Sequence, residues 1–268
     1  MNGQQRPFAV VTGASSGIGF ELAKVLAEED FDLLITAEDE IETAQRELNQ
    51  LTASVECTRL DLSREEEVVR LHERIQATAR PVDVLCLNAG IGEGGDFARE
   101  TDLRKELRLV DLNVRSVVHL CKLVVRGMVA RDEGRILITS SIASTMPGAF
   151  QAVYNASKSF DQSFALALRN ELKDTNVTVT ALMPGPTETE FFERAGMEDT
   201  PIGESEKDDP AEVARQGFEA LMAGDERVVA GSFKNKAQVA AGRVLPDSVK
   251  AELHRKQAQP ATASERND

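Results

Sequence analysis

The chain contains a single tyrosine, Tyr154, which stands four residues before Lys158 in the stretch AVYNASKSF. Residues four apart lie on the same face of a helix, so the phenol and the ammonium group would be neighbours. A phenol transfers protons poorly at neutral pH because its pKa is near 10, and an adjacent ammonium group lowers that pKa. The pair is therefore suited to protonating an alkoxide that forms on hydride transfer, although the same spacing also occurs on exposed helix faces.

Ser141 is the second candidate for chemistry, because it follows the apolar run 135–140 and precedes Tyr154 by thirteen residues. The small residues of the stretch STMPGA allow the chain to turn back between them. Ligands of open parallel sheets bind at the carboxyl ends of the strands. We therefore expect the Ser141 hydroxyl to hydrogen-bond a substrate oxygen beside the tyrosine.

A glycine-rich turn, TGASSGIG at 12–19, follows the first apolar run and precedes the helical stretch FELAKVLAEE. Glycines let the backbone approach a phosphate, and the N–H groups and dipole of the following helix attract it. A purely structural turn is the alternative, but this turn is the first strand-to-helix junction of an alternating chain. It predicts a dinucleotide site with contacts from Gly13, Ser15, Ser16, Gly17, Ile18 and Gly19.

The segment AEDE after the second apolar run indicates which dinucleotide binds. Glu38 lies about 20 positions past the glycines, where a carboxylate binds the ribose hydroxyls of NAD and repels the 2′-phosphate of NADP. Asp39 follows it. No Arg or Lys is present in this segment or beside the second glycine, where Ser16 stands. The sequence thus favours NAD without excluding NADP, while a solvated carboxylate at a helix start is the alternative for Glu38.

Apolar runs with strand character alternate with longer amphipathic runs along the chain. Strands are predicted at 8–12, 32–36, 54–60, 82–87, 135–140, 177–182 and 227–231, and helices near 17–29, 40–52, 64–78, 103–131, 151–174 and 210–223. Continuously apolar strands are typical of a parallel sheet that is covered on both faces. The prediction is an α/β fold: a single doubly wound, Rossmann-like parallel sheet of about seven strands with helices on both faces.

The composition excludes several classes of partner. A net charge of −14 disfavours nucleic acid and anionic membranes. No apolar run approaches the roughly 18 residues of a membrane-spanning helix, and the N-terminal stretch does not resemble a secretory signal. The cysteines show no C-x-x-C spacing, so we expect reduced thiols in a cytoplasmic protein and no metal site. The cysteines are Cys57, Cys86 and Cys121, and the histidines, for which we favour packing or surface roles, are His72, His119 and His254.

Together these motifs resemble the short-chain dehydrogenase/reductase family, over roughly residues 8–231. The resemblance rests on Thr12-Gly13-x-x-x-Gly17-x-Gly19, Asn88-Ala89-Gly90, Asn113, Ser141, Tyr154-x-x-x-Lys158 and Pro184-Gly185. Two departures are present. The aspartate of many NAD-preferring relatives is Ala37 here, with the carboxylate one position later, and Leu87 replaces the first of two asparagines.

The resemblance implies a role for each matching position. Tyr154 would be the acid/base, Lys158 would lower its pKa and bind the nicotinamide ribose, Ser141 would orient the carbonyl, and Asn113 would hold a relay water. Further cofactor contacts are implied for Asp61 and Leu62 at adenine, for Asn88, Ala89 and Gly90, and for Pro184, Gly185, Thr187 and Thr189 near the carboxamide. The resemblance also implies a homodimer or homotetramer formed by the helices near 103–131 and 151–174.

We expect a dinucleotide-binding catalytic domain at 1–231, with a substrate lid at about 186–209. Residues 232–268 would form an extension with helices at about 234–256, interrupted at Pro246, and a disordered tail. The extension could close over the site or meet another subunit, but packing on the body is favoured.

The lid is rich in carboxylates, which is usually a solvated face and otherwise disfavours anionic substrates. Apolar residues that could line a pocket or belong to the core are Met146, Phe150, Phe191 and Phe192. The leading hypothesis is an oxidoreductase that acts on an apolar ketone or secondary alcohol. An NADPH-linked 3-oxoacyl-carrier-protein reductase, with Arg126 and Arg131 as candidates for a basic docking face, is the alternative. A regulatory protein that binds a dinucleotide without catalysing a reaction is the third hypothesis.

Overall fold

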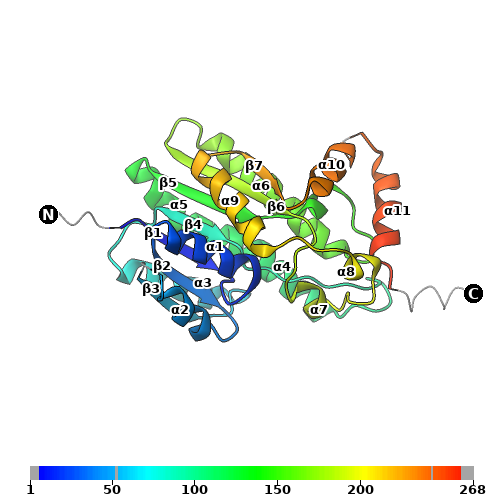
Figure 1. Ribbon diagram of the computed structural model, residues 1–268, viewed down its shortest axis with the longest axis horizontal. Helices are drawn as coiled ribbons and strands as arrows, with labels where there is room; N and C mark the ends of the chain where they lie inside the picture. Colours follow the sequence, from blue (N-terminus) through cyan, green and yellow to red (C-terminus); the bar gives the residue numbers. More distant parts are fainter. Residues whose placement is uncertain (1–5, 52–53, 243, 261–268) are drawn as a thin grey trace, which may run out of the picture.

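A computed structural model of the protein describes residues 6–51, 54–242 and 244–260. Within them, seven parallel strands form one sheet in the order β3-β2-β1-β4-β5-β6-β7 (Figure 1). The strands are β1 (Phe8–Thr12), β2 (Asp32–Ala37), β3 (Val55–Arg59), β4 (Val84–Leu87), β5 (Gly134–Thr139), β6 (Val177–Pro184) and β7 (Arg227–Ala230). The predicted doubly wound α/β fold is confirmed.

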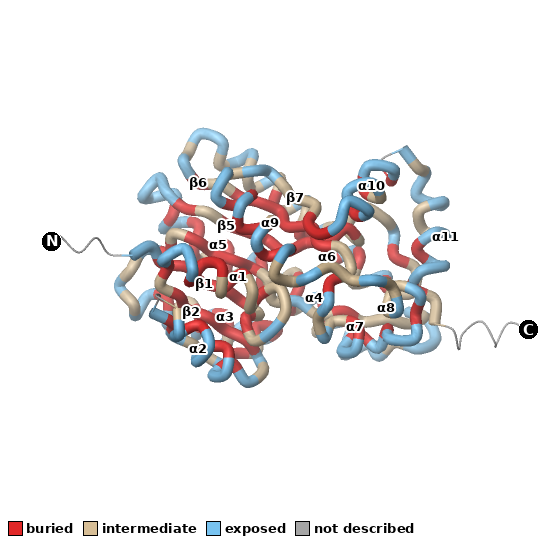
Figure 2. The backbone as a smooth tube through the Cα atoms, viewed as in Figure 1, coloured by how far each residue is buried: buried red, intermediate tan, exposed pale blue. Residues whose placement is uncertain are grey.

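The central strands are buried on both faces, which explains their continuously apolar sequences (Figure 2). Ala9 and Val11 of β1 face one core cluster, and Phe8 and Val10 face the other. The first cluster is covered by α1 (Gly17–Glu28), α2 (Glu42–Leu48) and α9 (Pro210–Ala223). The second is covered by α3 (Glu65–Ala77), α5 (Ser116–Arg131) and α6 (Ala152–Glu171).

The segment predicted as one helix at 103–131 contains an irregularity. It begins as α4 (Leu103–Val110), passes through the π-helical turn η1 (Asp111–Arg115) and continues as α5. A π turn inserts one extra residue into a helix and occurs often at functional sites. Here it contains Asn113.

Some predicted boundaries were wrong. The helix expected at 40–52 ends at Leu48, because Asn49 leaves the helix and its Oδ1 accepts a hydrogen bond from Val55 N (3.3 Å) at the start of β3. The helix expected at 151–174 ends at Glu171, and β6 runs two residues beyond the predicted strand, to Pro184.

After β6 the chain forms the lid, with short helices α7 (Phe191–Arg194) and α8 (Pro201–Glu204). The 3-10 turn η2 (Ile142–Thr145) lies between β5 and α6. The C-terminal segment forms α10 (Phe233–Gly242) and α11 (Asp247–Ala258), with Pro246 at the break as predicted. Helix α10 packs against β7 and η2, and α11 packs against α8 (Figure 1). The disordered tail was expected to begin at Gln257, but α11 continues to Ala258; residues 261–268 of that tail lie outside the described residues.

Candidate active site

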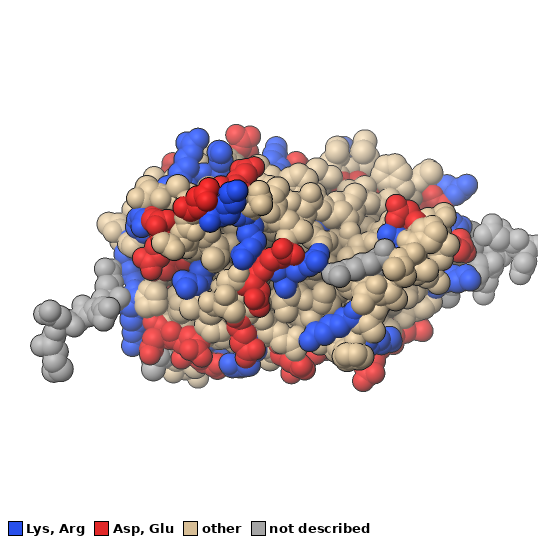
Figure 3. Space-filling model, turned by 90° about the horizontal axis from the view of Figure 1, so that it is seen from above, with Lys and Arg blue, Asp and Glu red and all other residues tan. Residues whose placement is uncertain are grey.

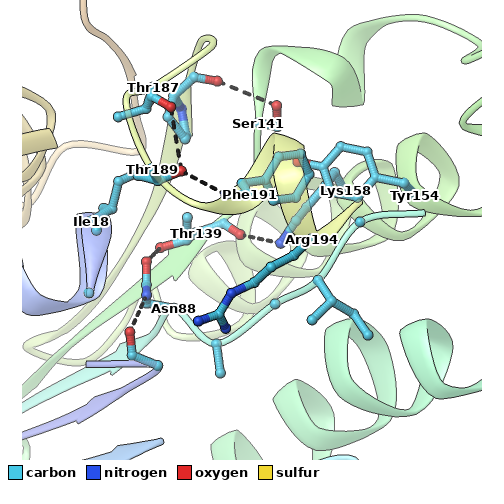
Figure 4. Close-up of a pocket in the computed structure, with 18 of the residues that line it drawn as sticks. Ile18, Asn88, Thr139, Ser141, Tyr154, Lys158, Thr187, Thr189, Phe191 and Arg194 are labelled. Atoms are coloured by element: carbon cyan, nitrogen blue, oxygen red, sulfur yellow. Dashed lines mark hydrogen bonds between the residues drawn. The ribbon is translucent and has the colours of Figure 1, made fainter. Parts of the chain in front are cut away.

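A pocket opens at the carboxyl edge of the sheet, where a doubly wound fold binds its ligands (Figure 4). Its walls come from the turn between β1 and α1, the segments after β2 to β6, the lid and α11. All the predicted cofactor contacts line it, as do Ser141, Tyr154 and Lys158. Asn113 does not.

The glycine-rich turn is shaped to hold a phosphate group. Gly13 has a φ of +68°, which side chains disfavour, and its N–H donates to Thr36 O (2.8 Å). A Cβ on Gly19 would lie 2.0 Å from Gly13 O, so only glycine fits there. The side chain of Ser16 does not cap α1, so the first N–H groups of this helix face the pocket and suit a pyrophosphate.

Asn88 joins three strands beneath that turn. Thr12 Oγ1 accepts hydrogen bonds from the N–H groups of Asn88 and Ala89 (3.0 Å each), and Asn88 Nδ2 donates to Gly13 O (3.3 Å). On the other side, Thr139 Oγ1 donates to Asn88 Oδ1 (3.0 Å). The side chain thus fixes the ends of β1, β4 and β5 relative to one another, which holds the floor of the pocket (Figure 4).

Helix α6 carries the tyrosine and the lysine on one face, as predicted. The Tyr154 ring packs against Phe191 of the lid, with centroids 5.1 Å apart. Lys158 is buried, and its Nζ donates to Thr139 O (2.8 Å) and to Asp161 Oδ2 (3.2 Å). Burial raises the pKa of Tyr154 above its ordinary value; the charge of Lys158 and the Ser141 hydroxyl lower it by less. The expected effect of Lys158 therefore has the predicted sign but is outweighed by burial.

Ser141 ends the segment after β5 and caps η2. Its Oγ accepts from Ala143 N (3.1 Å) and donates to Pro184 O (3.4 Å). These bonds fix the hydroxyl on the pocket wall beside Tyr154. This arrangement brings the side chains predicted for substrate oxygen and proton transfer to one wall.

Asn113 lies behind the pocket wall rather than on it. Its Oδ1 accepts from Ile91 N (3.0 Å), and its Nδ2 donates to Ile91 O (2.9 Å) and Ser157 Oγ (3.1 Å). A Cβ on Gly90 would lie 3.2 Å from Asn113 Oδ1 and 3.3 Å from Lys158 Nζ. Asn113 and Lys158 therefore approach each other behind Gly90, and the π turn η1 places the asparagine there.

The adenosine end of the pocket differs from the expectation that it offers no basic residue. Glu38 and Asp39 line it, but Arg108 of α4 forms an ion pair with the Glu38 carboxylate and Arg59 Nε donates to Glu38 O (2.7 Å). Arg194 of the lid pairs with Asp39 (2.6 Å) and itself lines the pocket. The expectation was wrong because the arginines come from distant segments that the fold brings together.

The remaining predicted contacts also have fixed positions. Asp61 accepts at Oδ1 from Ser63 N (3.0 Å) and Oγ (2.7 Å), and Leu62 follows it on the pocket wall. On the lid side, Thr187 Oγ1 donates to Gly185 O (2.9 Å), and Thr189 Oγ1 accepts from Phe191 N (3.3 Å) (Figure 4). These bonds hold the segment after β6 against the pocket.

The other end of the pocket is mainly apolar. Met146, Phe191 and Phe192 line it, together with Ile202 of α8. Phe150, the fourth predicted apolar residue, packs in the neighbouring cluster and does not line the pocket; the Arg255 guanidinium lies over its ring (5.1 Å to the centroid).

Helix α11 supplies a wall that no sequence motif indicated. His254 and Gln257 line the pocket, and His254 is buried. His254 Nδ1 lies 3.0 Å from Ala149 O, so this nitrogen carries the proton, and burial lowers the pKa of the imidazole. At neutral pH His254 therefore carries no charge, and the C-terminal extension packs on the body while contributing to the site.

Within the described ranges, no cluster of histidine, cysteine and carboxylate side chains is arranged to hold a metal ion. The same ranges contain no helix that is long and apolar enough to span a membrane. All three cysteines are free.

Comparison with known proteins identifies the class of this site. The family model described as short chain dehydrogenase matches residues 7–199. An uncharacterized oxidoreductase of Staphylococcus saprophyticus is 31% identical, over 81% of this chain and 92% of its own. A probable NADP-dependent dehydrogenase of Haemophilus influenzae is 32% identical, over 66% of this chain and 70% of its own. A short-chain dehydrogenase structure from Sphingobium yanoikuyae, in complex with NADPH, superposes with a TM-score of 0.79 at 25% identity, over 94% and 97% of the two chains.

Fold and site together define an NAD(P)-dependent oxidoreductase. The chain belongs to the short-chain dehydrogenase/reductase family.

Proposed function

We propose that the protein interconverts an uncharged, apolar ketone and the corresponding secondary alcohol. The observation that carries this proposal is the convergence of Ser141, Tyr154 and Lys158 on one pocket wall, opposite the uncapped start of α1. The pocket beyond Tyr154 is apolar, and burial keeps the imidazole of His254 uncharged.

The residues present fit a nicotinamide dinucleotide. The N–H groups at the start of α1 would hold the pyrophosphate, Asp61 and Leu62 would contact adenine, and Thr187 and Thr189 would contact the carboxamide. When bound, the cofactor supplies or accepts the hydride. Lys158 would fix the ribose, because Thr139 O and Asp161 take only two of its three hydrogens.

The protein's own part in the chemistry is proton transfer. The Ser141 hydroxyl would turn its hydrogen from Pro184 O to the substrate oxygen, and Tyr154 Oη would give that oxygen its proton during reduction or remove it during oxidation. Asn113, which lies beside Ile91 and approaches Lys158 behind Gly90, would hold a relay water. The raised pKa of Tyr154 keeps the phenol protonated at neutral pH, the form that reduction needs.

The test is a substrate screen with the purified protein. A panel of ketones and secondary alcohols, matched in size but differing in net charge, would be followed by the absorbance of NADH or NADPH. We expect the highest kcat/KM for uncharged, apolar members. A preference for carboxylates or phosphates would contradict the proposed substrate class, and cofactor binding without turnover of any member would support a regulatory role instead.

We further propose NAD as the preferred cofactor, since Glu38 lies at the ribose end of the pocket. Arg108 and Arg194 compete with this interpretation, because either could turn to a 2′-phosphate if its carboxylate partner moved. We expect Glu38→Arg to shift the ratio of kcat/KM values toward NADP by about tenfold or more, since a repulsive charge becomes an attractive one. Glu40→Arg, two positions further along the same acidic segment and not among the residues that line the pocket, is the matched control. An unchanged ratio in Glu38→Arg would mean that Glu38 does not face the ribose.

The NADPH-linked 3-oxoacyl-carrier-protein reductase has weaker support. Its acidic partner needs a basic docking face near the pocket, but acidic and basic side chains are intermixed on the face shown in Figure 3. Arg131, a predicted docking residue, donates to Val82 O (2.9 Å) just before β4 begins, at the opposite edge of the sheet from the pocket. Turnover of a carrier-bound substrate well above that of the free thioester would favour this alternative.

We propose that the protein is a homodimer or homotetramer. Support comes from exposed apolar residues on α4, where Leu103 is 67% and Leu107 55% exposed, and from the exposed Phe160 of α6, a helix that packs against α4. Exposed apolar patches are typical of surfaces that meet another subunit. We expect light scattering to give the mass of a dimer or tetramer, and Leu107→Arg to shift it toward the monomer. A monomeric mass for the unaltered protein would contradict the proposal.

We propose that the chain consists of a catalytic domain at 1–231, with the lid at about 186–209, and an extension at 232–268. We propose that the reaction takes place in the cytoplasm, because all three cysteines are free thiols, as is usual in a reducing compartment. Recovery of the protein from another compartment on cell fractionation would contradict that location.

A further inference from the structure

Behind the catalytic lysine lies a buried carboxylate that the mechanism above does not use as an acid or base. Asp161 is 0% exposed, one helical turn after Lys158, and its Oδ2 lies 3.2 Å from Lys158 Nζ. Its Oδ1 is buried without a hydrogen-bond partner among the described residues. A carboxylate in such a place is costly unless it is paired, so Lys158 is what makes it tolerable.

The charged groups on the neighbouring elements do not replace Lys158 as the partner. On α4 and η1, which pack against α6, Arg108 pairs with Glu38 and Arg115 pairs with Asp111. Glu106 of α4 is buried, and as a second carboxylate it could not neutralise Asp161. Strand β6 and the turn η2 carry no titratable side chain, and Arg135 lies at the start of β5, at the opposite end of the strand from Thr139.

Lys158 therefore has two protein partners that differ in charge. The Thr139 carbonyl holds the ammonium group without neutralising it, whereas an ionised Asp161 offsets part of its charge. The charges of both groups act on Tyr154: Lys158 lowers the pKa of the phenol and Asp161 raises it. Burial raises the pKa of Asp161 itself to about 6, so the carboxylate is ionised at pH 7 and above.

We propose that Asp161 is a positioning residue that holds the Lys158 ammonium group and reduces the positive charge acting on Tyr154, so that the site is biased toward carbonyl reduction. The bias rests on the proposed function, because it assigns proton transfer to Tyr154. Its physical basis is independent of substrate: with less positive charge nearby, the phenolate forms less readily and the phenol stays protonated to higher pH.

The composition of the chain makes this charge effect directly measurable. Tyr154 is the only tyrosine and tryptophan is absent, so the near-ultraviolet absorbance change on phenolate formation reports this one side chain. A pH titration of the purified protein without cofactor or substrate therefore gives the midpoint of Tyr154 ionisation. The variant Tyr154→Phe, which should show no such change, is the blank.

The decisive variant is Asp161→Asn, which removes the charge but keeps an oxygen that can accept from Lys158. We expect the midpoint of Tyr154 ionisation to move to lower pH, since a group that raises the pKa of the phenol is lost. The kcat/KM of reduction should then fall off at lower pH than in the unaltered protein, and the acidic limb of the oxidation profile, where Tyr154 must be ionised, should also move to lower pH. Lys158→Met should move the midpoint in the opposite direction.

Two further variants separate charge from structure. Asp161→Leu removes the hydrogen bond as well, so we expect the same direction of shift together with several-fold weaker NADH binding. Asp32→Asn is the matched control: it removes a carboxylate from a largely buried ion pair with Arg80 (2.7 Å) that lies away from the pocket, and it should leave the midpoint unchanged.

The outcomes distinguish this inference from the proposed function. An unchanged or raised midpoint in folded Asp161→Asn and Asp161→Leu would overturn the role of Asp161, even if the enzyme reduces ketones as proposed. A lowered midpoint in a protein that turns over no carbonyl compound would uphold the charge effect and contradict the proposed function.

Discussion

Replacing Tyr154 with phenylalanine is expected to lower kcat for both reaction directions by ~10²–10⁴-fold, the usual contribution of a general acid or base. The substitution removes only the hydroxyl, and the ring can keep its packing against Phe191 at 5.1 Å between centroids. Folding and cofactor affinity should therefore change little. Steady-state kinetics and a calorimetric titration with NADH measure the two effects on the same preparation.

Phe191→Leu serves as the control for a packing role of the ring. If Tyr154 contributed only packing, removing its partner would lower kcat more than removing the hydroxyl does. Turnover retained in Tyr154→Phe would rule out the proposed proton transfer. A loss of turnover accompanied by a matching loss of cofactor affinity would instead assign the tyrosine to binding.

Lys158→Ala is expected to impair both cofactor binding and turnover. Loss of one charge-assisted hydrogen bond to the ribose costs about 1.5–3 kcal/mol, which corresponds to a dissociation constant for NADH that is roughly 10–100-fold higher. The kcat at saturating cofactor should fall by ~10²-fold or more, because the charge that lowers the pKa of Tyr154 is lost. The acidic limb of the oxidation profile, where Tyr154 must be ionised, should move to higher pH for the same reason.

Lys173→Ala, an exposed lysine just after the same helix, is the control and should leave all three quantities unchanged. A variant Lys158→Ala that binds NADH normally but has lost turnover would restrict the lysine to its effect on Tyr154. Normal turnover with weak NADH binding would restrict the role of Lys158 to binding the ribose.

Much of the fold could be predicted because parallel strands buried on both faces are continuously apolar. All seven strands lie where the apolar runs are, and the errors concern their ends. The strand expected from residue 82 begins at Val84, since Val82 O accepts from Arg131 and is not available to the sheet. Such side-chain bonds to the backbone have no periodic signature. The π turn at Asp111–Arg115 was missed because its residues are ordinary for a helix.

The site was predictable where its residues are close in sequence. The glycines of 13–19 and the pair Tyr154 and Lys158 belong to single turns, so their spacing alone places them together. Arg194 meets Asp39 across 155 positions, and no local pattern could indicate that contact. Asp161 lies only three residues after Lys158 in the sequence, but the sequence alone does not reveal that its carboxylate is fully buried.

The two ends of the pocket are built with unequal rigidity. The cofactor end consists of turns tied directly to the strands, as Asn88 ties β1, β4 and β5. The far end is closed by α11, which is not joined directly to any strand. It contacts the body of the protein through side chains, such as that of His254, whose ring nitrogen lies beside Ala149 O. Exchanging this one helix could therefore retarget the enzyme to other substrates while its redox machinery stays intact, which makes α11 the natural segment to vary in directed evolution.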